Sequence, residues 1–255
     1  MILRPLTAVG AGLAAALIAL AAPTAAQQTL DQSRSAFDGV SPQGNWSAAI
    51  ARTDRGHLIG NPEADTRLIE FISYTCSHCA SFAMEGEPAI DITLLTPGKM
   101  AVEVRPVIRN ALDLTVSLLA QCGDPAGFKD RHRAFMYGQS QWLAKFQNAP
   151  QSQKAIWSRA DKASRMSAAS ALGLIDMLVQ RGQWIADVNA CVMDDVAAQK
   201  LVNDGAADRL ELKVAVTPSF ALDDQLLVDV HSWAGLYPLL SARFAPDVAD
   251  ESGGG

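Results

Sequence analysis

The sequence contains little of several features that would define a protein class. It has four cysteines in 255 residues, too few for the disulfide framework of a small secreted domain. Charged residues make up 19% and the formal net charge is −6, which argues against the clustered Lys and Arg of a DNA or RNA binder. A hydrophobic fraction of 49% still supplies a core and argues against disorder throughout. We therefore expect a globular protein with no nucleic-acid partner.

Long apolar runs are also scarce, and the one present lies at the N-terminus. Arg4 precedes an Ala- and Leu-rich run at 13–22, and Pro23 and small residues up to Ala26 follow. The run is short and Ala-rich for a membrane anchor, so the pattern predicts a signal peptide over 1–26. The protein is then expected to be exported to the periplasm, where disulfides persist.

The two ends of the remaining chain are polar. Residues 27–56 are rich in Gln, Ser, Asp and Gly and predict a flexible leader with one short helix at 46–52. Residues 246–255 end in three glycines and predict a disordered tail.

The segment after the leader predicts a βαβ unit. An apolar run at 66–74 is typical of a buried strand, and 100–108 alternates as a second strand does. The residues between them, 80–95, have a helical pattern. Because a helix joins the two strands, we expect them to be parallel.

The rest of the chain predicts a helical insert and a final ββα unit. Residues 112–212 are rich in Ala, Leu, Gln and Met and predict four or five helices, with breaks near 123–125, 148–150 and 182. Strand patterns return at 217–222 and 225–230 around the turn Asp223-Asp224, and a helix follows at 232–244.

Cys76-Ser77-His78-Cys79 lies where the first strand gives way to a helix. A thiol at a helix N-terminus meets unpaired N–H groups and the positive end of the helix dipole, and His78 adds a donor or a positive charge. These groups favour the Cys76 thiolate and make it a good leaving group. Cys79, one turn further in, is expected to resolve the mixed disulfide.

Two other interpretations of the cysteine pair remain open. A zinc site would need a second Cys or His pair, but Cys122, Cys191, His132 and His231 stand apart in the sequence, so no metal is expected. A purely structural disulfide in so small a ring would contribute little loop entropy.

The chain resembles the DsbA-like thiol:disulfide oxidoreductases of the thioredoxin superfamily. The resemblance is carried by 60–64, by 68–79 with Cys-x-His-Cys, and by Thr217-Pro218 before the hairpin. It implies an α/β thioredoxin fold with an inserted all-helical lobe, and no cofactor. The thioredoxin-fold domain would span 57–110 and 213–245, and the lobe 111–212.

The resemblance also implies roles for individual residues. Cys76 would be the nucleophile, Cys79 the resolving thiol, and His78 would stabilise the Cys76 thiolate. Pro218 would be cis beside the disulfide, and Thr217 would offer its backbone to an extended substrate strand.

Glu70 matches an acidic residue that the family often places beneath the active site. Its position inside an apolar strand predicts burial and a raised pKa, and it would relay protons to or from Cys79. The alternative is a carboxylate at a sheet edge in water.

The other two cysteines both fall in the insert. Four cysteines allow three pairings, and a 76–79 redox pair leaves Cys122 with Cys191. In an oxidising compartment we expect them to be bridged; a loop of about 70 residues would stabilise the chain by roughly 4 kcal/mol at most. The alternative is two buried free thiols.

These features together predict a periplasmic thiol:disulfide oxidoreductase that exchanges disulfides with exported polypeptides and is recycled by a membrane partner, either a quinone-linked oxidase or a reductant. Ser77 stands where the family often has Pro, and Thr217 also occurs in isomerases and reductases. A disulfide isomerase or reductase therefore remains an alternative, as does a non-catalytic chaperone-like binding module.

Two surfaces are also expected: a solvated basic face at 131–133, and an apolar contact near Cys76 from Phe82 or Met84.

Overall fold

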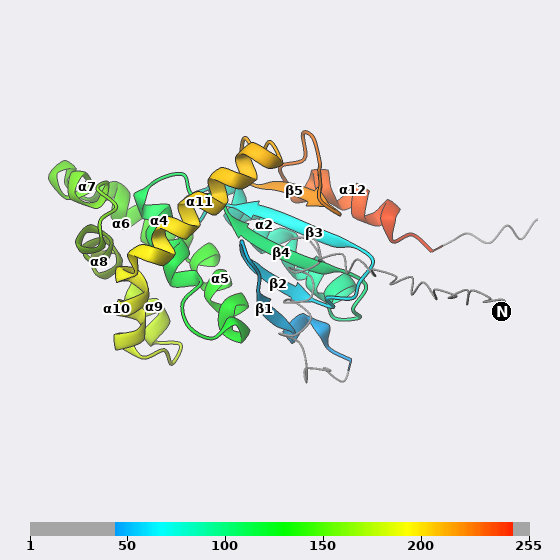
Figure 1. The fold of residues 1–255 in the computed structure, drawn as a ribbon, viewed down its shortest axis with the longest axis horizontal. Coiled ribbons are helices and arrows are strands. Elements are labelled where there is room, and N and C mark those ends of the chain that lie inside the picture. Colours follow the sequence, from blue (N-terminus) through cyan, green and yellow to red (C-terminus); the bar gives the residue numbers. More distant parts are fainter. Residues whose placement is uncertain (1–43, 247–255) are drawn as a thin grey trace, which may run out of the picture.

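The computed structural model describes residues 44–246. The predicted signal peptide, the leader up to residue 43 and the tail from residue 247 lie outside the described residues. Figure 1 shows a sheet with helices packed on it at one end and a lobe of helices at the other. From residue 67 onward the order of elements is the predicted one, a βαβ unit, a helical insert and a ββα unit.

A mixed sheet of six strands forms the body, in the order β1-β2-β4-β3-β5-β6. Only β3 and β4 pair in parallel, as predicted for the βαβ unit, and the other neighbours are antiparallel. Asp223 and Asp224 turn the hairpin with φ of 50° and 66°, the positive values of a tight hairpin turn. The strands are β1 (Ile50–Arg52), β2 (His57–Gly60), β3 (Arg67–Ile72), β4 (Ala101–Pro106), β5 (Ser219–Leu222) and β6 (Gln225–Leu226).

Part of the predicted leader belongs to this sheet. The short helix expected at 46–52 is wrong: a 3₁₀ turn, η1 (Trp46–Ala48), leads into β1, which pairs with β2. Ala49, Ala51 and Leu58 are buried in a small cluster with Ala101, and this burial holds the two strands in the sheet. Strands of three and four residues are too short to show a clear alternation, so the sequence did not reveal them.

One face of the sheet carries the main core and the first helices. The predicted helix at 80–95 is divided into α2 (Ser77–Glu85), α3 (Glu87–Ile90) and a π-helical turn, η2 (Asp91–Leu95). Pro88 lies at the start of α3, where its missing N–H interrupts the helical hydrogen bonds. The last helix, α12 (Trp233–Arg243), is capped by the Ser232 hydroxyl and packs into the same core through Leu236 and Leu240.

Eight α-helices build the lobe between residues 111 and 211, so the predicted four or five is wrong. The three predicted breaks are present, and further ones occur at Gly138, at Ala160, at Gly173 and at Asp194, which caps the next helix. The helices are α4 (Ala111–Ala120), α5 (Phe128–Tyr137), α6 (Gln139–Asn148), α7 (Gln151–Trp157), α8 (Lys162–Ala171), α9 (Leu174–Val179), α10 (Ile185–Met193) and α11 (Asp195–Glu211), with a 3₁₀ turn, η3 (Pro125–Gly127).

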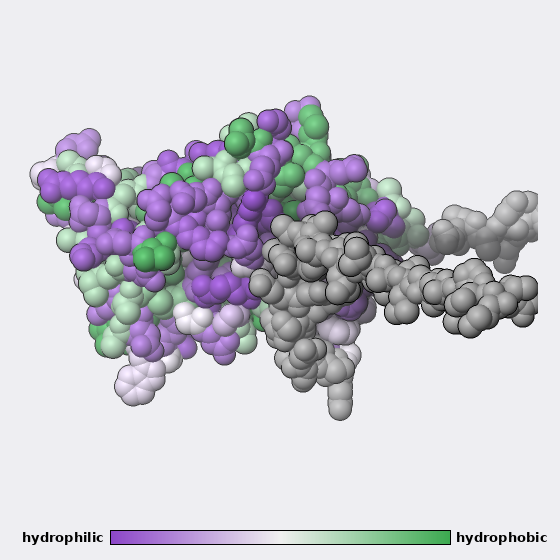
Figure 2. Space-filling view, viewed as in Figure 1, coloured by the Kyte–Doolittle hydropathy of each residue, from purple (hydrophilic) through white to green (hydrophobic). Residues whose placement is uncertain are grey.

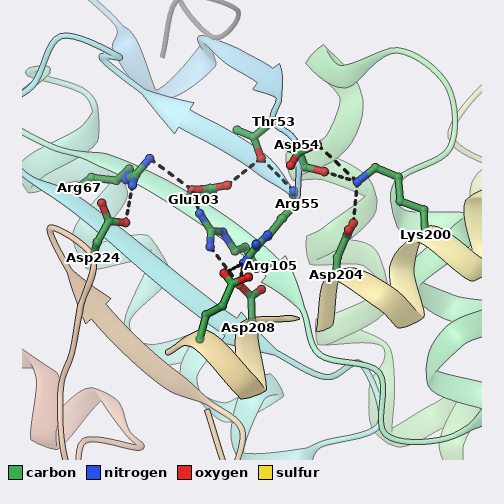
Figure 3. A network of polar contacts seen from close by, with 12 residues as sticks. Thr53, Asp54, Arg55, Arg67, Glu103, Arg105, Lys200, Asp204, Asp208 and Asp224 are labelled. Carbon is green, nitrogen blue, oxygen red and sulfur yellow. Dashed lines mark hydrogen bonds and ion pairs between the residues drawn. The ribbon is translucent and has the colours of Figure 1, made fainter. Parts of the chain in front are cut away.

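The long helix α11 runs from the lobe back to the sheet (Figure 1). Its buried Asp208 lies 2.8 Å from an Arg55 nitrogen and 3.1 Å from an Arg105 nitrogen. Arg105 also bonds Glu103 at 2.8 Å, so α11 is tied to β4 and to the turn between β1 and β2 (Figure 3). This buried polar network lies on the sheet face opposite α2, because residues 103 and 105 alternate with the core residues Val102 and Val104.

The surface differs from expectation in two places. Arg131 and His132 are 4% and 1% exposed, so the residues 131–133 do not form a solvated basic face. Phe82 is buried against Phe220, and Met84 is the exposed one of the predicted apolar pair.

Hydrophilic residues predominate on the face shown in Figure 2. Among residues 44–246, none of the helices has the length and apolar character needed to cross a bilayer.

Candidate active site

The two cysteines of Cys76-x-x-Cys79 begin helix α2. Cys76 is the N-cap residue, with extended backbone angles, and the helix starts at Ser77 rather than at the predicted residue 80. Cys79 is 1% exposed and Cys76 5% exposed, and both are free thiols in this structure. The N-cap position aims the Cys76 sulfur at the N–H groups that the helix leaves unpaired.

These surroundings favour the thiolate form of Cys76. The pKa of the Cys76 thiol is lowered to about 4, chiefly because the Cys79 thiol donates a hydrogen bond to it. Thr217 and the backbone N–H groups of Cys79 and His78 act in the same direction, and partial burial opposes them. A thiol with such a pKa is ionised at neutral pH and is therefore both a nucleophile and a good leaving group.

The pKa of the second cysteine, Cys79, is shifted in the opposite direction. Burial raises the pKa of the Cys79 thiol well above its usual value, and its hydrogen bond to Cys76 adds to the effect. The Cys79 sulfur also accepts a hydrogen bond from the Ser73 N–H, at 3.5 Å. The pair therefore consists of an ionised sulfur at the helix start, beside the cavity, and a protonated, more deeply buried sulfur.

A loop that precedes β5 closes the site over Cys76. The Thr217–Pro218 peptide bond is cis, and the Cys76 sulfur lies 3.1 Å from the Thr217 carbonyl oxygen. The Ser219 hydroxyl donates to the Val216 carbonyl at 2.8 Å, and His231 Nδ1 lies 2.9 Å from the Pro218 carbonyl oxygen. These bonds fix the loop, so the Thr217 backbone stays beside the reactive sulfur.

His78 has a different position from the one expected for a direct partner of Cys76. Its side chain is exposed and lines an open cavity next to Cys76. The His78 group that favours the thiolate is its backbone N–H. The exposed ring and Cys76 therefore share one cavity.

Glu70 lies on β3, a central strand, and is 1% exposed, which rules out a sheet-edge carboxylate in water. Burial raises the pKa of its carboxyl well above the usual value, and the nearby charge of Glu87 adds to this. One carboxyl oxygen, Oε2, has no hydrogen-bond partner within residues 44–246. Glu70 shares the α2 face of the sheet with Cys79, but no direct hydrogen bond joins the two among the described residues.

A buried chain of polar side chains lies nearby. His132 Nδ1 is 3.0 Å from the Tyr74 hydroxyl, and His132 Nε2 is 2.8 Å from Glu87 Oε1. A small cavity between β3 and α5 is lined by Glu70, Glu87 and His132, among others. These contacts explain why His132, which the sequence placed on a solvated face, is buried.

Two lobe residues that sequence reasoning missed hold the reactive loop. Asp113 on α4 accepts hydrogen bonds from the Ser73 hydroxyl at 2.7 Å and the Tyr74 N–H at 2.8 Å. Gln139 on α6 donates to the carbonyl oxygens of Tyr74 at 2.7 Å and Cys76 at 2.9 Å. Asn110 is a residue typical of a helix N-cap and marks the start of α4, but nothing in the sequence marks the contacts of Asp113 or Gln139 with the loop.

The remaining cysteines are joined to each other. The sulfurs of Cys122 and Cys191 are 2.07 Å apart, a disulfide that links the end of α4 to α10. Within residues 44–246, no group of three or more His, Cys, Asp or Glu side chains is arranged to hold a metal ion.

A low-pKa thiol at a helix start, a buried partner thiol and a cis-proline loop, on a mixed sheet with an inserted helical lobe, are the site and fold of a thioredoxin-like protein. The thioredoxin family model matches residues 52–242. The chain belongs to the thioredoxin family.

Similar proteins agree with this assignment. A crystal structure of a protein-disulfide isomerase from Novosphingobium aromaticivorans is 37% identical, covers 75% of this chain and 99% of its own, and has a TM-score of 0.72. Wolbachia pipientis α-DsbA1 is 21% identical over 72% of this chain and 87% of its own, with a TM-score of 0.57, and shows the fold alone. A Rickettsia conorii protein named as a protein-disulfide oxidoreductase is 30% identical over 90 residues. That match spans 35% of this chain and 32% of the relative, about a third of its length.

Proposed function

We propose that the protein is a thiol:disulfide oxidoreductase whose redox centre is the Cys76–Cys79 pair. The observation that carries the proposal is the opposite shift of the two pKa values, downward for Cys76 and upward for Cys79, beside the cis-proline loop. A stabilised Cys76 thiolate favours the reduced pair, so the oxidised pair tends to pass its disulfide to a substrate.

The exchange takes two steps. A substrate thiolate attacks Cys76 of the oxidised pair, forming a substrate–Cys76 disulfide and releasing Cys79 as a thiolate that takes up a proton. A second substrate thiolate then attacks the substrate sulfur, forms the substrate disulfide and releases the Cys76 thiolate. The second leaving group is the one whose pKa is about 4, which makes its departure favourable.

Glu70 is the proposed source of the proton for Cys79. Its raised pKa favours the protonated carboxyl, and its Oε2 has no partner within residues 44–246. Because no direct bond to Cys79 is present, the transfer would pass through a water molecule between the two groups. His78 and Thr217 would contact the substrate, the latter by pairing its backbone with an extended strand.

The proposed substrates are exported polypeptides in the periplasm. The predicted signal peptide and the Cys122–Cys191 disulfide support an oxidising compartment. After each turnover the reduced pair would need a membrane redox partner, such as a quinone-linked oxidase. Fractionation of cells that express the full chain, with detection in the periplasmic fraction, tests the location.

The redox equilibrium of the Cys76–Cys79 pair against glutathione tests the activity. We expect mass spectrometry after alkylation to show both states interconverting near the periplasmic potential. A Cys79→Ser variant should accumulate Cys76-linked mixed disulfides with substrate, and a Cys76→Ser variant should not. A pair that stays oxidised and unreactive at every potential tested would instead support a non-catalytic binding module.

A disulfide isomerase is the second candidate. It is favoured by the similarity to the 37% identical Novosphingobium protein, which is named as a protein-disulfide isomerase. The two candidates differ in the state in which the protein acts. Fast oxidation of reduced ribonuclease with weak recovery of scrambled ribonuclease would indicate an oxidant, and strong recovery together with insulin reduction would indicate an isomerase or reductase.

A further inference from the structure

A cavity of about 290 Å³ opens beside the reactive sulfur. Cys76, His78 and Thr217 line it together with two arginines, Arg109 and Arg209. Its volume is at the low end of the roughly 300–1,000 Å³ of small-molecule sites, so it suits one or two side chains of a bound peptide.

The packing of α11 places Arg209 at this cavity. A Cβ at Gly205 would lie 3.2 Å from the Ile108 N–H nitrogen, a tight contact, so glycine eases the close approach of the helix to the chain just after β4. Asp208 is held by Arg55 and Arg105 in the buried polar network (Figure 3). The next residue, Arg209, donates to the Ile108 carbonyl oxygen at 3.3 Å.

Arg109 is placed by the same residue that holds the reactive loop. Its N–H donates to Asp113 Oδ2 at 3.0 Å, and Asp113 also binds Ser73 and Tyr74. Within residues 44–246 the Arg109 side chain makes no hydrogen bond or ion pair, and Arg209 bonds no carboxylate. Both side chains are exposed and available to a ligand.

The charge around the cavity is opposite to that of the whole chain. The formal net charge is −6, yet among residues 44–246 no Asp or Glu lines the cavity. The two guanidinium groups, neither of which bonds a carboxylate among those residues, create a positive potential that selects for a negative group on a partner. The Thr217 backbone lies on the same cavity, so a strand paired with it would carry its neighbouring side chains past the arginines.

We propose that this cavity binds the carboxylate of an Asp or Glu close to the reacting cysteine of a polypeptide substrate. The proposal rests on the disulfide exchange proposed above and adds a substrate preference to it. The competing interpretation is that both arginines act only on the Cys76 thiolate.

Single-turnover kinetics with capped peptides test the preference. Each peptide holds one cysteine and either Asp or Asn at one position within two residues of it, and the amide cap removes the terminal carboxylate. The rate of mixed-disulfide formation with the oxidised protein gives an Asp-to-Asn ratio for each protein variant. Intrinsic differences between the peptides cancel when the ratios of two variants are compared.

We expect the ratio at low salt to exceed that of an Arg109→Gln/Arg209→Gln variant by about fivefold, the size of one or two exposed ion pairs, and to fall as salt is added. A variant with Arg109→Gln and Arg209→Lys should recover part of the Asp-to-Asn ratio that the double Gln variant loses. Arg181→Gln is the matched control, because Arg181 is also exposed and bonds only a backbone carbonyl, at 2.6 Å. It should keep the ratio of the unaltered protein.

The outcomes separate this proposal from the one it rests on. Equal slowing of the Asp and Asn peptides in the double variant would show that the arginines act on the thiolate, and would overturn the preference while leaving the exchange intact. A preference found for glutathione but for no peptide would also overturn it, since the ligand would be a small thiol. Failure of the unaltered protein to react with any peptide would overturn both proposals.

Discussion

The side-chain amide of Gln139 donates to the backbone carbonyl oxygens of both Tyr74 and Cys76, at 2.7 and 2.9 Å. Gln139 belongs to the helical lobe, whereas Cys76 begins a helix of the sheet domain. The lobe is therefore part of the scaffold that sets the geometry of the reactive loop.

Replacing Gln139 with Leu should destabilise the protein by about 2 kcal/mol, because two buried hydrogen bonds are lost at a net 0.5–1.5 kcal/mol each. Urea denaturation of the oxidised protein measures the change. Gln141→Leu on the same helix is the control, since Gln141 is exposed, and it should shift stability by less than about 0.5 kcal/mol. Equal effects of the two substitutions would contradict a role for Gln139 in holding the loop.

The stability of the reduced protein relative to the oxidised protein should depend on pH. The pKa of Cys76 is about 4 in the folded protein, against about 8.5 in an unfolded chain. A lowered pKa gives stability that is fully present above the unfolded value and is lost as the pH falls through the folded value. The Tm of the reduced form minus that of the oxidised form should therefore decrease steadily from pH 8 to pH 4.

The oxidised protein serves as the internal control in that measurement, because its cysteines do not titrate and all other groups are shared. Cys79 interferes little below pH 8, since its raised pKa keeps it protonated in the folded protein and the ordinary thiol pKa of about 8.5 keeps it mostly protonated in the unfolded chain. A difference in Tm that is constant over this range would show that Cys76 is not an acidic thiol.

Replacing Glu70 with Gln should slow the step that releases Cys79 by about a hundredfold, because the proposed proton donor is removed. In the unaltered protein that rate, corrected for the substrate thiolate fraction, should fall as the pH rises through the raised pKa of Glu70. The variant should lose this limb of the pH profile. Glu85→Gln on the exposed side of α2 is the control, and a limb that persists in Glu70→Gln would exclude Glu70 as the donor.

Replacing Asp208 with Asn should cost about 3 kcal/mol, because it leaves the partly buried Arg105 and Arg55 without their shared carboxylate. Burial raises the pKa of Asp208 while both arginines oppose the shift, and their short contacts indicate the ionised form. Glu211→Gln removes the other carboxylate that contacts Arg55. Because Glu211 is 54% exposed, this substitution should cost much less than Asp208→Asn. Chemical denaturation compares the two, and equal losses would show that burial of the network adds nothing.

The sequence predicted those parts of the site that local patterns specify. Cys76 and Cys79 are recognisable because a strand changes to a helix at that point, and Thr217-Pro218 because a proline precedes a hairpin. Asp113 and Gln139 were not recognisable, since they lie 39 and 63 residues from the backbone groups they bind. The burial of His132 likewise depends on Tyr74 and Glu87, which are distant in sequence.

The same reason explains the errors in the fold. The strands β1 and β2 are held in the sheet because Ala49, Ala51 and Leu58 are buried against Ala101. Ala101 lies about forty residues after Leu58 in the sequence. The number of lobe helices was underestimated partly because two of the breaks lie at residues other than glycine and proline: Ala160 adopts a positive φ, and Asp194 caps the next helix. Tertiary contacts decide such positions, and a local pattern does not contain them.

The disulfide between Cys122 and Cys191 has a consequence for the chain after proteolytic cleavage. A protease that cuts any exposed turn from η3 to α10 leaves two fragments that remain covalently joined. The nicked molecule would migrate as one band without reductant and as two with it. After such a single cut, whether before or after Gln139, the segment that contributes Gln139 to the reactive loop would thus stay attached.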